Sequence, residues 1–282
     1  MSLTSKPITR AVVACGGWST RFLPACKVYN KALLPLLDRP VIDYLLAELA
    51  GAGLQEVALV HRPDDHSLVD YYQNCPRLEK YLRQKKQLNL LAGWFKLKKA
   101  FRRLEFISQS ASLPYGSAAP LLAAQNFLCN EPFVYKYGDD LTLEPETGAH
   151  LARLIKTFTL NHALAAISGQ KVTRSQIVRL GSLQLTPTGD LQHIEEKPVP
   201  RRGLSLLAHT SPFVFSPAVW PVLRHLQSHL SFPEFRLTDA TNVLAQQGRV
   251  AVEIFQSARW LTTGDPQNWL AALNQLNRLN HS

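Results

Sequence analysis

Short apolar runs rich in β-forming residues alternate with helical patterns along the first half of the chain. The runs at 8–14, 56–60, 104–108 and 133–137 each predict a buried strand. Between the first two runs, the apolar residues of 41–49 recur at the spacing of a helix. Such alternation is typical of an α/β fold with a Rossmann-like, mixed but mostly parallel central sheet flanked by helices.

The second half of the chain adds a smaller β-rich part. Residues 177–199 alternate apolar and polar side chains around the turn sequence Thr186-Pro187-Thr188-Gly189-Asp190, which predicts a β-hairpin. Further elements are expected as a helix at 151–158, strands at 163–168, 204–215 and 250–255, and helices at 116–127, 217–226 and 238–247. Thr238 or Asp239 is expected to cap the helix at 238–247, and Asp265-Pro266 to begin a last helix. No linker or repeat interrupts this order, so we expect one domain over 1–282.

The composition of the chain indicates the cellular compartment in which it is found. Of the 282 residues, 46% are hydrophobic and 18% charged, which allows a sizeable core. No apolar run approaches the length of a membrane span, and the first seven residues show no signal-peptide pattern. Four widely spaced cysteines without a C-x-x-C pair argue against a zinc site or a disulfide framework. We therefore expect a cytoplasmic protein with no membrane partner.

The net charge of +10 is concentrated in one segment. Residues 77–105 contain ten Lys or Arg and two Glu, with leucines at mostly helical spacing. We interpret about 77–103 as a basic insert of one or two amphipathic helices, broken near Gly93, with a solvated face. A subunit contact in a homo-oligomer (a dimer or tetramer) or an attraction for anionic substrates are the alternatives. No recognition motif accompanies the charge, which argues against a nucleic-acid partner.

The loop after the first strand carries the strongest functional signal. Gly16-Gly17-Trp18-Ser19-Thr20-Arg21 links a strand to a region that also contains Lys27 and Lys31. A small-residue loop between a strand and a helix presents backbone N–H groups to phosphate, although residue type alone leaves a plain structural turn equally open. Three cations without an acidic neighbour in the sequence favour a bound anion. Asp139 and Asp140 end the strand at 133–137, where open α/β sheets bind ligands; for Asp140, a solvent-exposed turn is the competing interpretation.

The order of motifs extends this signal over nearly the whole chain. Residues 8–35 resemble the signature of the sugar-nucleotide pyrophosphorylases, a nucleotidyltransferase family, and are most similar to its bacterial UTP–glucose-1-phosphate uridylyltransferases. The matching segments are Gly16-Gly17-Trp18-Ser19-Thr20-Arg21-Phe22-Leu23-Pro24, Lys27, Lys31, Pro35, Asp38-Arg39-Pro40, Gln109, Tyr115-Gly116, Gly138-Asp139, Glu196-Lys197-Pro198, Leu237-Thr238-Asp239-Ala240 and Trp260-Leu261-Thr262-Thr263-Gly264.

The resemblance implies a role for each matching position. It implies nucleotide binding by Gly16, Gly17, Arg21, Lys31, Gln109 and Gly116, sugar-phosphate binding by Gly181, Glu196 and Lys197, catalytic roles for Arg21, Lys31 and Asp139, and Mg²⁺ binding by Asp139. A Gln side chain offers a donor and an acceptor, which suits the edge of uracil. The implied substrates are a nucleoside triphosphate and a sugar 1-phosphate. The implied reaction is attack by glucose 1-phosphate on the α-phosphorus of UTP, which releases pyrophosphate.

Five positions depart from the family pattern. Ser19 replaces a loop glycine, Asn30 and Ala32 replace the Pro and Glu that flank Lys31, and Pro212 stands where the uridylyltransferases often have Arg. Thr262 stands where the family usually has a second metal-binding Asp, which Asp140 or Asp265 would have to replace. The pattern therefore leaves open an active enzyme, one that uses another sugar or nucleotide, or a weakly active paralogue that binds nucleotide and regulates an active homologue.

Overall fold

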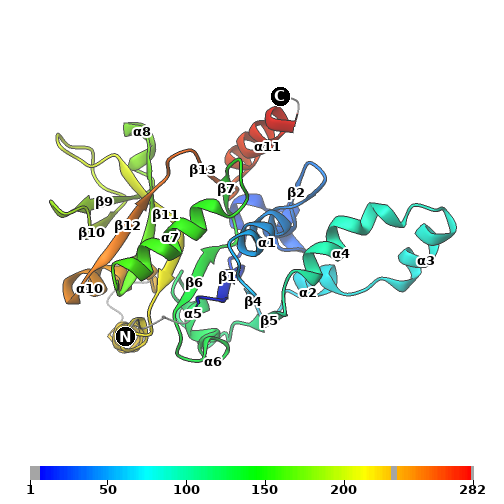
Figure 1. Ribbon diagram of the computed structural model, residues 1–282, viewed down its shortest axis with the longest axis horizontal. Helices are drawn as coiled ribbons and strands as arrows, with labels where there is room; N and C mark the ends of the chain where they lie inside the picture. The colour runs from blue at the N-terminus through cyan, green and yellow to red at the C-terminus, as the bar shows by residue number, and fades with distance from the viewer. Residues whose placement is uncertain (1–6, 230–233, 281–282) are drawn as a thin grey trace.

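A mixed sheet forms the centre of the computed structural model, which describes residues 7–229 and 234–280 (Figure 1). Nine strands make up this sheet in the described ranges, in the order β10-β9-β11-β6-β1-β4-β5, with β8 and β12 attached through β11. Their bounds are β1 (Arg10–Ala14), β4 (Glu56–His61), β5 (Arg103–Ser108), β6 (Phe133–Tyr137), β8 (Ala165–Lys171), β9 (Gly181–Leu185), β10 (Leu191–Glu196), β11 (Leu207–Phe215) and β12 (Val250–Ile254).

The central strands β6, β1, β4 and β5 run parallel, so their carboxyl ends meet at one edge. The long strand β11 pairs antiparallel with both β6 and β8, and it joins the parallel part to the β9–β10 hairpin. The sheet is therefore mixed, with a parallel centre and a β-rich part beside it. The expected fold class is confirmed.

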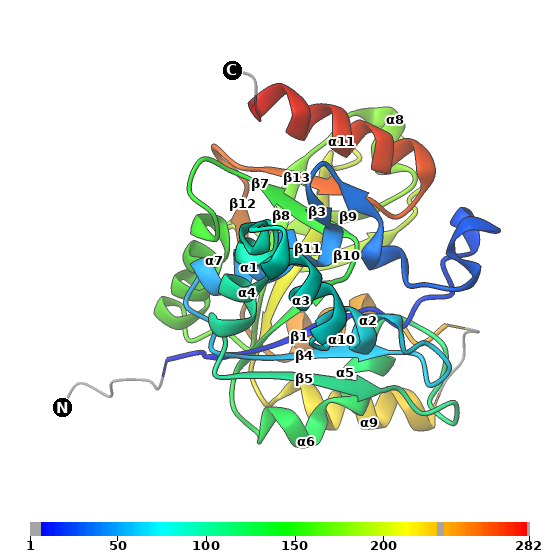
Figure 2. The same cartoon turned by 90° about the vertical axis from the view of Figure 1, so that its right-hand side faces the viewer.

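Helices cover both faces of the sheet (Figure 2). The helices are α1 (Val41–Gly51), α2 (Ser67–Tyr72), α3 (Pro76–Gln84), α4 (Ala92–Lys99), α5 (Ala119–Ala123), α6 (Gln125–Leu128), α7 (Ala149–Leu160), α8 (Arg174–Ile177), α9 (Val219–Ser228), α10 (Leu237–Gln247) and α11 (Pro266–Asn280). Successive strand residues alternate between two apolar layers: Ala11 and Val13 pack with α1 and α7, whereas Val12 packs with α5, α9 and α10. This alternation explains why β1 is a continuous apolar run.

Two short strand pairs lie outside the main sheet. One joins β2 (Pro35–Leu36) to β3 (Arg39–Pro40). The other joins β7 (Asp140–Leu143) to β13 (Arg259–Thr262) and sets Thr262 opposite Asp140. This second pair, which no sequence pattern predicted, brings a distant segment to the end of β6.

The basic insert forms an arm, residues 76–99, that extends away from the sheet (Figure 1). The insert forms two helices, as predicted, and the break between them lies at 85–91, just before Gly93, the second residue of α4. The chain leaves α3 at Lys85–Gln87, where Lys86 has a positive φ of 56°. A 3₁₀ turn at Leu88–Leu91 then leads into α4.

The structure also corrects one predicted helix cap and refines the hairpin. Neither Thr238 nor Asp239 caps α10, since the helix begins at Leu237, whose N–H donates to Ser117 Oγ at 3.0 Å. The cap of α11 is confirmed, because Asp265 Oδ1 accepts from Asn268 N at 2.9 Å. The β9–β10 hairpin is confirmed, although the short helix α8 occupies the start of the predicted range. Across the described ranges, no helix is both long and apolar enough for a bilayer crossing.

Candidate active site

The loop after β1 lies over the carboxyl ends of the central strands and contacts the residue that follows β5. Gln109 N donates to His61 O at 2.8 Å, which continues the parallel pairing beyond the strand. Its side chain reaches the loop, so that a Cβ at Gly16 would lie 2.9 Å from Gln109 Oε1. The fold thus brings together two residues that the resemblance assigns to the nucleotide, and glycine at 16 allows the close approach.

The ammonium of Lys31 donates to the carboxylate of Asp139. Both side chains are about one-fifth exposed, at 21% and 22%. The backbone of Asp139 is fixed by Thr263, whose N–H and Oγ1 both donate to Asp139 O, at 2.7 and 3.1 Å. The loop lysine therefore has an acidic partner that is distant in the sequence, at the end of β6.

Arg21 and Thr262 approach the same carboxylate near Gly264. A Cβ at Gly264 would lie 2.9 Å from Asp139 Oδ2, 3.3 Å from Thr262 Oγ1 and 3.6 Å from the nearest Arg21 nitrogen. Arg21 also lies 3.7 Å from Asp265 at the start of α11, but its side chain is 69% exposed. Lys31, Arg21 and the Thr262 hydroxyl thus gather around the Asp139 carboxylate at the end of β6, an arrangement that is suited to a phosphate group.

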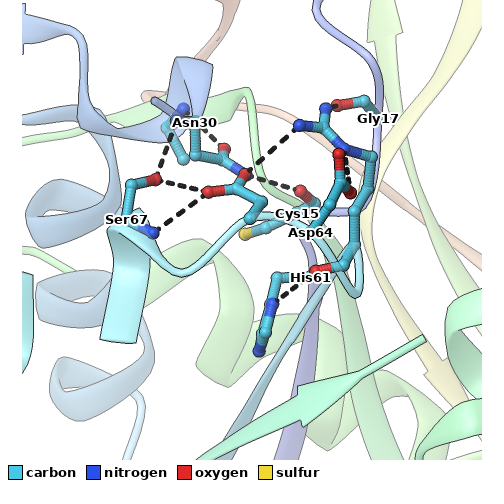
Figure 3. Close-up of polar contacts among 9 residues, drawn as sticks. Cys15, Gly17, Asn30, His61, Asp64 and Ser67 are labelled. Atoms are coloured by element: carbon cyan, nitrogen blue, oxygen red, sulfur yellow. Dashed lines mark hydrogen bonds and ion pairs between the residues drawn. The ribbon is translucent and has the colours of Figure 1, made fainter. Parts of the chain in front are cut away.

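Asn30 anchors the far end of the loop (Figure 3). Its buried amide Nδ2 donates to Cys15 O at 2.7 Å and to Asp65 Oδ2 at 2.8 Å, and its Oδ1 accepts from Ala32 N at 3.0 Å. Asn30 N also donates to Ser67 Oγ at 2.9 Å. The residue that replaces a family proline therefore fixes the chain next to Lys31, an anchor that the sequence analysis missed.

Arg62 holds the beginning of the same loop. It donates to Gly17 O at 3.1 Å, its guanidinium lies 4.5 Å from the centre of the Trp18 ring, and it pairs with Asp64 at 3.2 Å. Asp65 lies 3.9 Å from Arg62. The segment 62–67 therefore contacts both ends of the loop. Although burial opposes it, hydrogen bonds from Ser67 and Asn30 lower the pKa of the Asp65 carboxyl below its ordinary value.

Ser19 adopts a left-handed backbone conformation. The glycine that the family usually has at this position adopts it more easily. Its φ is 54° and its ψ is 31°. Its Oγ is buried and accepts or donates no hydrogen bond among the described residues. A non-glycine residue in this region costs free energy, so the substitution leaves local strain in the loop.

Asp140 is a buried residue, and its interpretation as a solvent-exposed turn is wrong. The pairing of β7 with β13 turns its side chain inward, where it is 5% exposed and accepts from Ser211 Oγ at 3.0 Å. Burial and the neighbouring charge of Asp139 raise its pKa to about 6, against the opposing charge of Lys136. Because its carboxylate points to Ser211, it does not replace the missing second metal-binding Asp.

The residues assigned to the sugar phosphate lie around the β9–β10 hairpin. Glu196 ends β10, opposite Gly181 at the start of β9. The next residue, Lys197, is exposed and has a positive φ of 44°, and its N–H donates to Leu180 O at 2.9 Å. The hairpin therefore sets Glu196, Gly181 and Lys197 side by side.

Gly116 has a structural reason to be glycine. Its φ is +146°, and a Cβ there would lie 2.2 Å from Phe235 O. Phe235 N donates to Tyr115 O at 2.7 Å, and Ala118 N donates to Phe235 O at 3.0 Å. The close approach of these two backbones excludes any side chain at Gly116.

Tyr137 links the two halves of the site electrostatically. Burial, together with the charges of Asp140, Glu196 and Asp139, raises its pKa well above the ordinary range, against a hydrogen bond with Ser117. The charges of Asp139 at the strand end and of Glu196 at the hairpin end thus both act on the partly buried side chain of Tyr137.

No cluster of three or more His, Cys, Asp or Glu side chains suited to a metal ion occurs within 7–229 and 234–280. The donors that do gather are the Asp139 carboxylate and the Thr262 hydroxyl. Mg²⁺ is commonly bound by one or two carboxylates together with substrate phosphates, so this donor set fits a metal that arrives with a triphosphate.

The sequence model of the Nucleotidyl transferase family matches residues 10–278. The chain therefore belongs to the nucleotidyl transferase family. It is 30% identical over 260 residues to the UTP–glucose-1-phosphate uridylyltransferase of Bacillus subtilis (strain 168), a match that covers 90% of this chain and 86% of the relative. It is 32% identical over 269 residues to the enzyme of the same name from Streptococcus pneumoniae serotype 4, with coverage of 92% and 86%.

Solved structures show the same architecture. An apo UDP-glucose pyrophosphorylase superposes with a TM-score of 0.86 at 21% identity, over 97% of this chain and 99% of that one. The UTP-bound UGPase from Acinetobacter baumannii superposes with a TM-score of 0.82 at 25% identity, over 95% of this chain and 93% of that one.

Proposed function

We propose that this chain forms UDP-glucose and pyrophosphate from UTP and glucose 1-phosphate. The observation that carries the proposal is the contact of Lys31 with Asp139, with Arg21 and Thr262 beside it, in a chain whose relatives are named UTP–glucose-1-phosphate uridylyltransferase. A lysine next to a carboxylate at the end of a parallel strand can position a triphosphate and stabilise its charge, which supports transfer between phosphate groups.

In the proposed reaction, a phosphate oxygen of glucose 1-phosphate attacks the α-phosphorus of UTP, and the bond to the leaving pyrophosphate breaks. No side chain acts as a nucleophile. Arg21 and Lys31 neutralise charge on the triphosphate, and Gln109 binds the edge of the uracil beside Gly16. Lys197 and Glu196 hold the phosphate and the hydroxyls of the sugar. Catalysis then consists of positioning and of electrostatic stabilisation.

Asp139 and Thr262 are the residues that would hold Mg²⁺ with the triphosphate. When bound, the metal supplies charge neutralisation on the phosphate oxygens. Lys31 must then exchange its contact with Asp139 for one with a phosphate, and the exposure of both side chains allows this exchange.

A second candidate function is a regulatory paralogue that binds nucleotide and turns over slowly. Two observations favour it: Thr262 offers a neutral hydroxyl where a carboxylate would bind Mg²⁺ more strongly, and Ser19 strains the nucleotide loop. Both changes affect the same site.

Pyrophosphate release distinguishes the two functions. The assay combines the protein and Mg²⁺ with each of UTP, dTTP, ATP and GTP against glucose, galactose and N-acetylglucosamine 1-phosphates. The proposal predicts the fastest release with UTP and glucose 1-phosphate, and almost none when either is omitted. Bound UTP without release for any pair would support the regulatory paralogue.

We also propose that the arm at 76–99 makes a subunit contact in a homo-oligomer. Its exposed Leu78, Tyr81 and Leu90, which are 43%, 54% and 68% exposed, support this role. Light scattering after size-exclusion chromatography is expected to show a dimer or tetramer that dissociates when the arm is deleted. A monomeric wild-type protein would contradict the proposal.

A further inference from the structure

A histidine that the sequence analysis did not single out lies against the sugar half of the site. His209 belongs to β11, and its side chain is 11% exposed. Its Nε2 lies 3.3 Å from Glu196 Oε1. Burial raises the pKa of the Glu196 carboxyl, but His209, Thr238 and Arg236 lower it. The resulting pKa lies below the ordinary value of a glutamate. The imidazole is therefore the main group that stabilises the charged form of the carboxylate assigned to the sugar hydroxyls.

The position of the ring depends on the glycine that the resemblance assigns to close packing with the sugar. A Cβ at Gly181 would lie 2.3 Å from His209 Cδ2 and 2.7 Å from Nε2. The centre of the Phe213 ring is 6.0 Å from the centre of the imidazole. Because Gly181 has no side chain, the imidazole fits directly against its backbone, and this packing restricts the directions in which the ring can point.

The surroundings of the ring also determine which nitrogen carries the proton. His209 Nδ1 is buried and has no hydrogen-bond partner in the part of the chain that the structure describes. A buried N–H without an acceptor costs free energy, whereas a bare ring nitrogen with only a lone pair costs less. The proton of the neutral ring therefore belongs on Nε2, the nitrogen that faces Glu196. At 3.3 Å, an Nε2–H of His209 is within reach of Glu196 Oε1.

We propose that His209 is a positioning residue for sugar recognition, an inference that rests on the proposed function. Its Nε2–H holds one carboxylate oxygen of Glu196, and the other oxygen stays free to accept from the hydroxyls of the sugar. Without His209, the Glu196 carboxylate, whose side chain is 25% exposed, can turn away from the sugar. The β9–β10 hairpin alone fixes the backbone of Glu196 but not the direction of its carboxylate.

Binding of UDP-glucose and of UDP, each measured by calorimetry, tests this role, because UDP lacks the sugar and serves as an internal reference. His209→Phe keeps a ring of similar size but removes the donor. It is expected to weaken UDP-glucose about tenfold, the effect of one hydrogen bond to a charged group, and to leave UDP unchanged. His209→Gln keeps an N–H that can reach Glu196 and should restore most of the affinity. Where the Phe variant does not fold, His209→Leu takes its place.

A double substitution separates positioning from packing. If His209 acts through Glu196, His209→Phe should cause no further loss of UDP-glucose affinity in a Glu196→Ala background. Equal weakening of UDP and UDP-glucose, unchanged UDP-glucose affinity in His209→Phe, or a full additional loss in the double variant would each overturn the inference while the proposed function stands. A wild-type protein that binds UDP but gains nothing from the glucose group would overturn the proposed function, and this inference with it.

Discussion

Lys31 and Asp139 are 108 positions apart in the chain, yet the ammonium of one donates to the carboxylate of the other. Lys31 comes from the loop after β1 and Asp139 from the end of β6, the strand that pairs with β1. The loop therefore closes onto the edge of the sheet at the point where the phosphates are expected. Under the proposed function, substrate binding opens this contact, because Lys31 then binds a phosphate and Asp139 binds Mg²⁺.

The hydroxyl of Thr262 beside Asp139 predicts weak metal binding that one substitution can strengthen. Thr262→Asp adds a second carboxylate to the point that both side chains flank, so half-maximal activity should need roughly tenfold less Mg²⁺. Titration of activity with Mg²⁺ measures the effect. Thr262→Asn introduces a side chain of the same shape as Asp but without its charge, and serves as the control. An equal Mg²⁺ requirement in all three proteins would count against a metal at this position.

The anchor at Asn30 predicts that loop order controls nucleotide affinity. Asn30→Ala leaves Asp65 and Cys15 O without their buried donor, so the free energy of unfolding should fall by about 2 kcal/mol and the affinity for UTP should fall with it. Asn74→Ala, at an exposed position just before the arm that accepts only a surface hydrogen bond from Lys98, should change stability by less than about 0.5 kcal/mol. Denaturant unfolding and UTP calorimetry measure both quantities. Wild-type UTP affinity in Asn30→Ala would show that the anchor does not order the loop.

The strained backbone at Ser19 predicts a stabilising substitution. Ser19→Gly removes a left-handed serine and its buried, unpartnered hydroxyl, and is expected to stabilise the protein by about 1 kcal/mol, or a melting temperature roughly 2 °C higher. Gly53→Ala is the matched opposite: at φ +87° with open space around the Cβ, only the backbone is strained. It should destabilise by about 1 kcal/mol. A lower melting temperature for Ser19→Gly would refute the assignment of strain.

The buried Asp140 predicts a pH-dependent loss of stability. Its pKa is raised from 3.8 to about 6 in the folded protein, so the folded state keeps a proton that the unfolded state has released. The contribution of Asp140 to the free energy of unfolding is therefore fully present below about pH 4. It is lost as the pH rises through about 6. Asp140→Asn still accepts from Ser211 and cannot ionise, so its advantage over the wild type should be larger at pH 7.5 than at pH 5. A difference that does not change between these pH values would contradict the assignment.

The arrangement of strands and helices could be predicted because it depends on local periodicity. The apolar run of β1 reflects burial against both apolar layers, and the helical spacing of 41–49 reflects burial against one of them. The order of motifs also indicated which distant residues meet, as Gln109 and Gly16 do.

The remaining features depend on single long-range contacts, which leave no periodic trace in the sequence. Strands β7 and β13 have four residues each, too few for a pattern, yet their pairing buries Asp140 and sets Thr262 beside the site. The hydrogen bond of Asn30 with Asp65 and the approach of His209 to Glu196 likewise involve one side chain from each segment. Such contacts become visible only when the whole chain is folded.

The fate of a labelled phosphate tests the central claim most directly. Glucose 1-phosphate with ¹⁸O in the non-bridging phosphate oxygens is incubated with UTP, Mg²⁺ and the protein. The masses of the products are measured by mass spectrometry. Asp139→Asn serves as the inactive control. The account predicts UDP-glucose that carries all of the label and pyrophosphate that carries none. Label in the pyrophosphate, or bound UTP with no UDP-glucose formed, would contradict it.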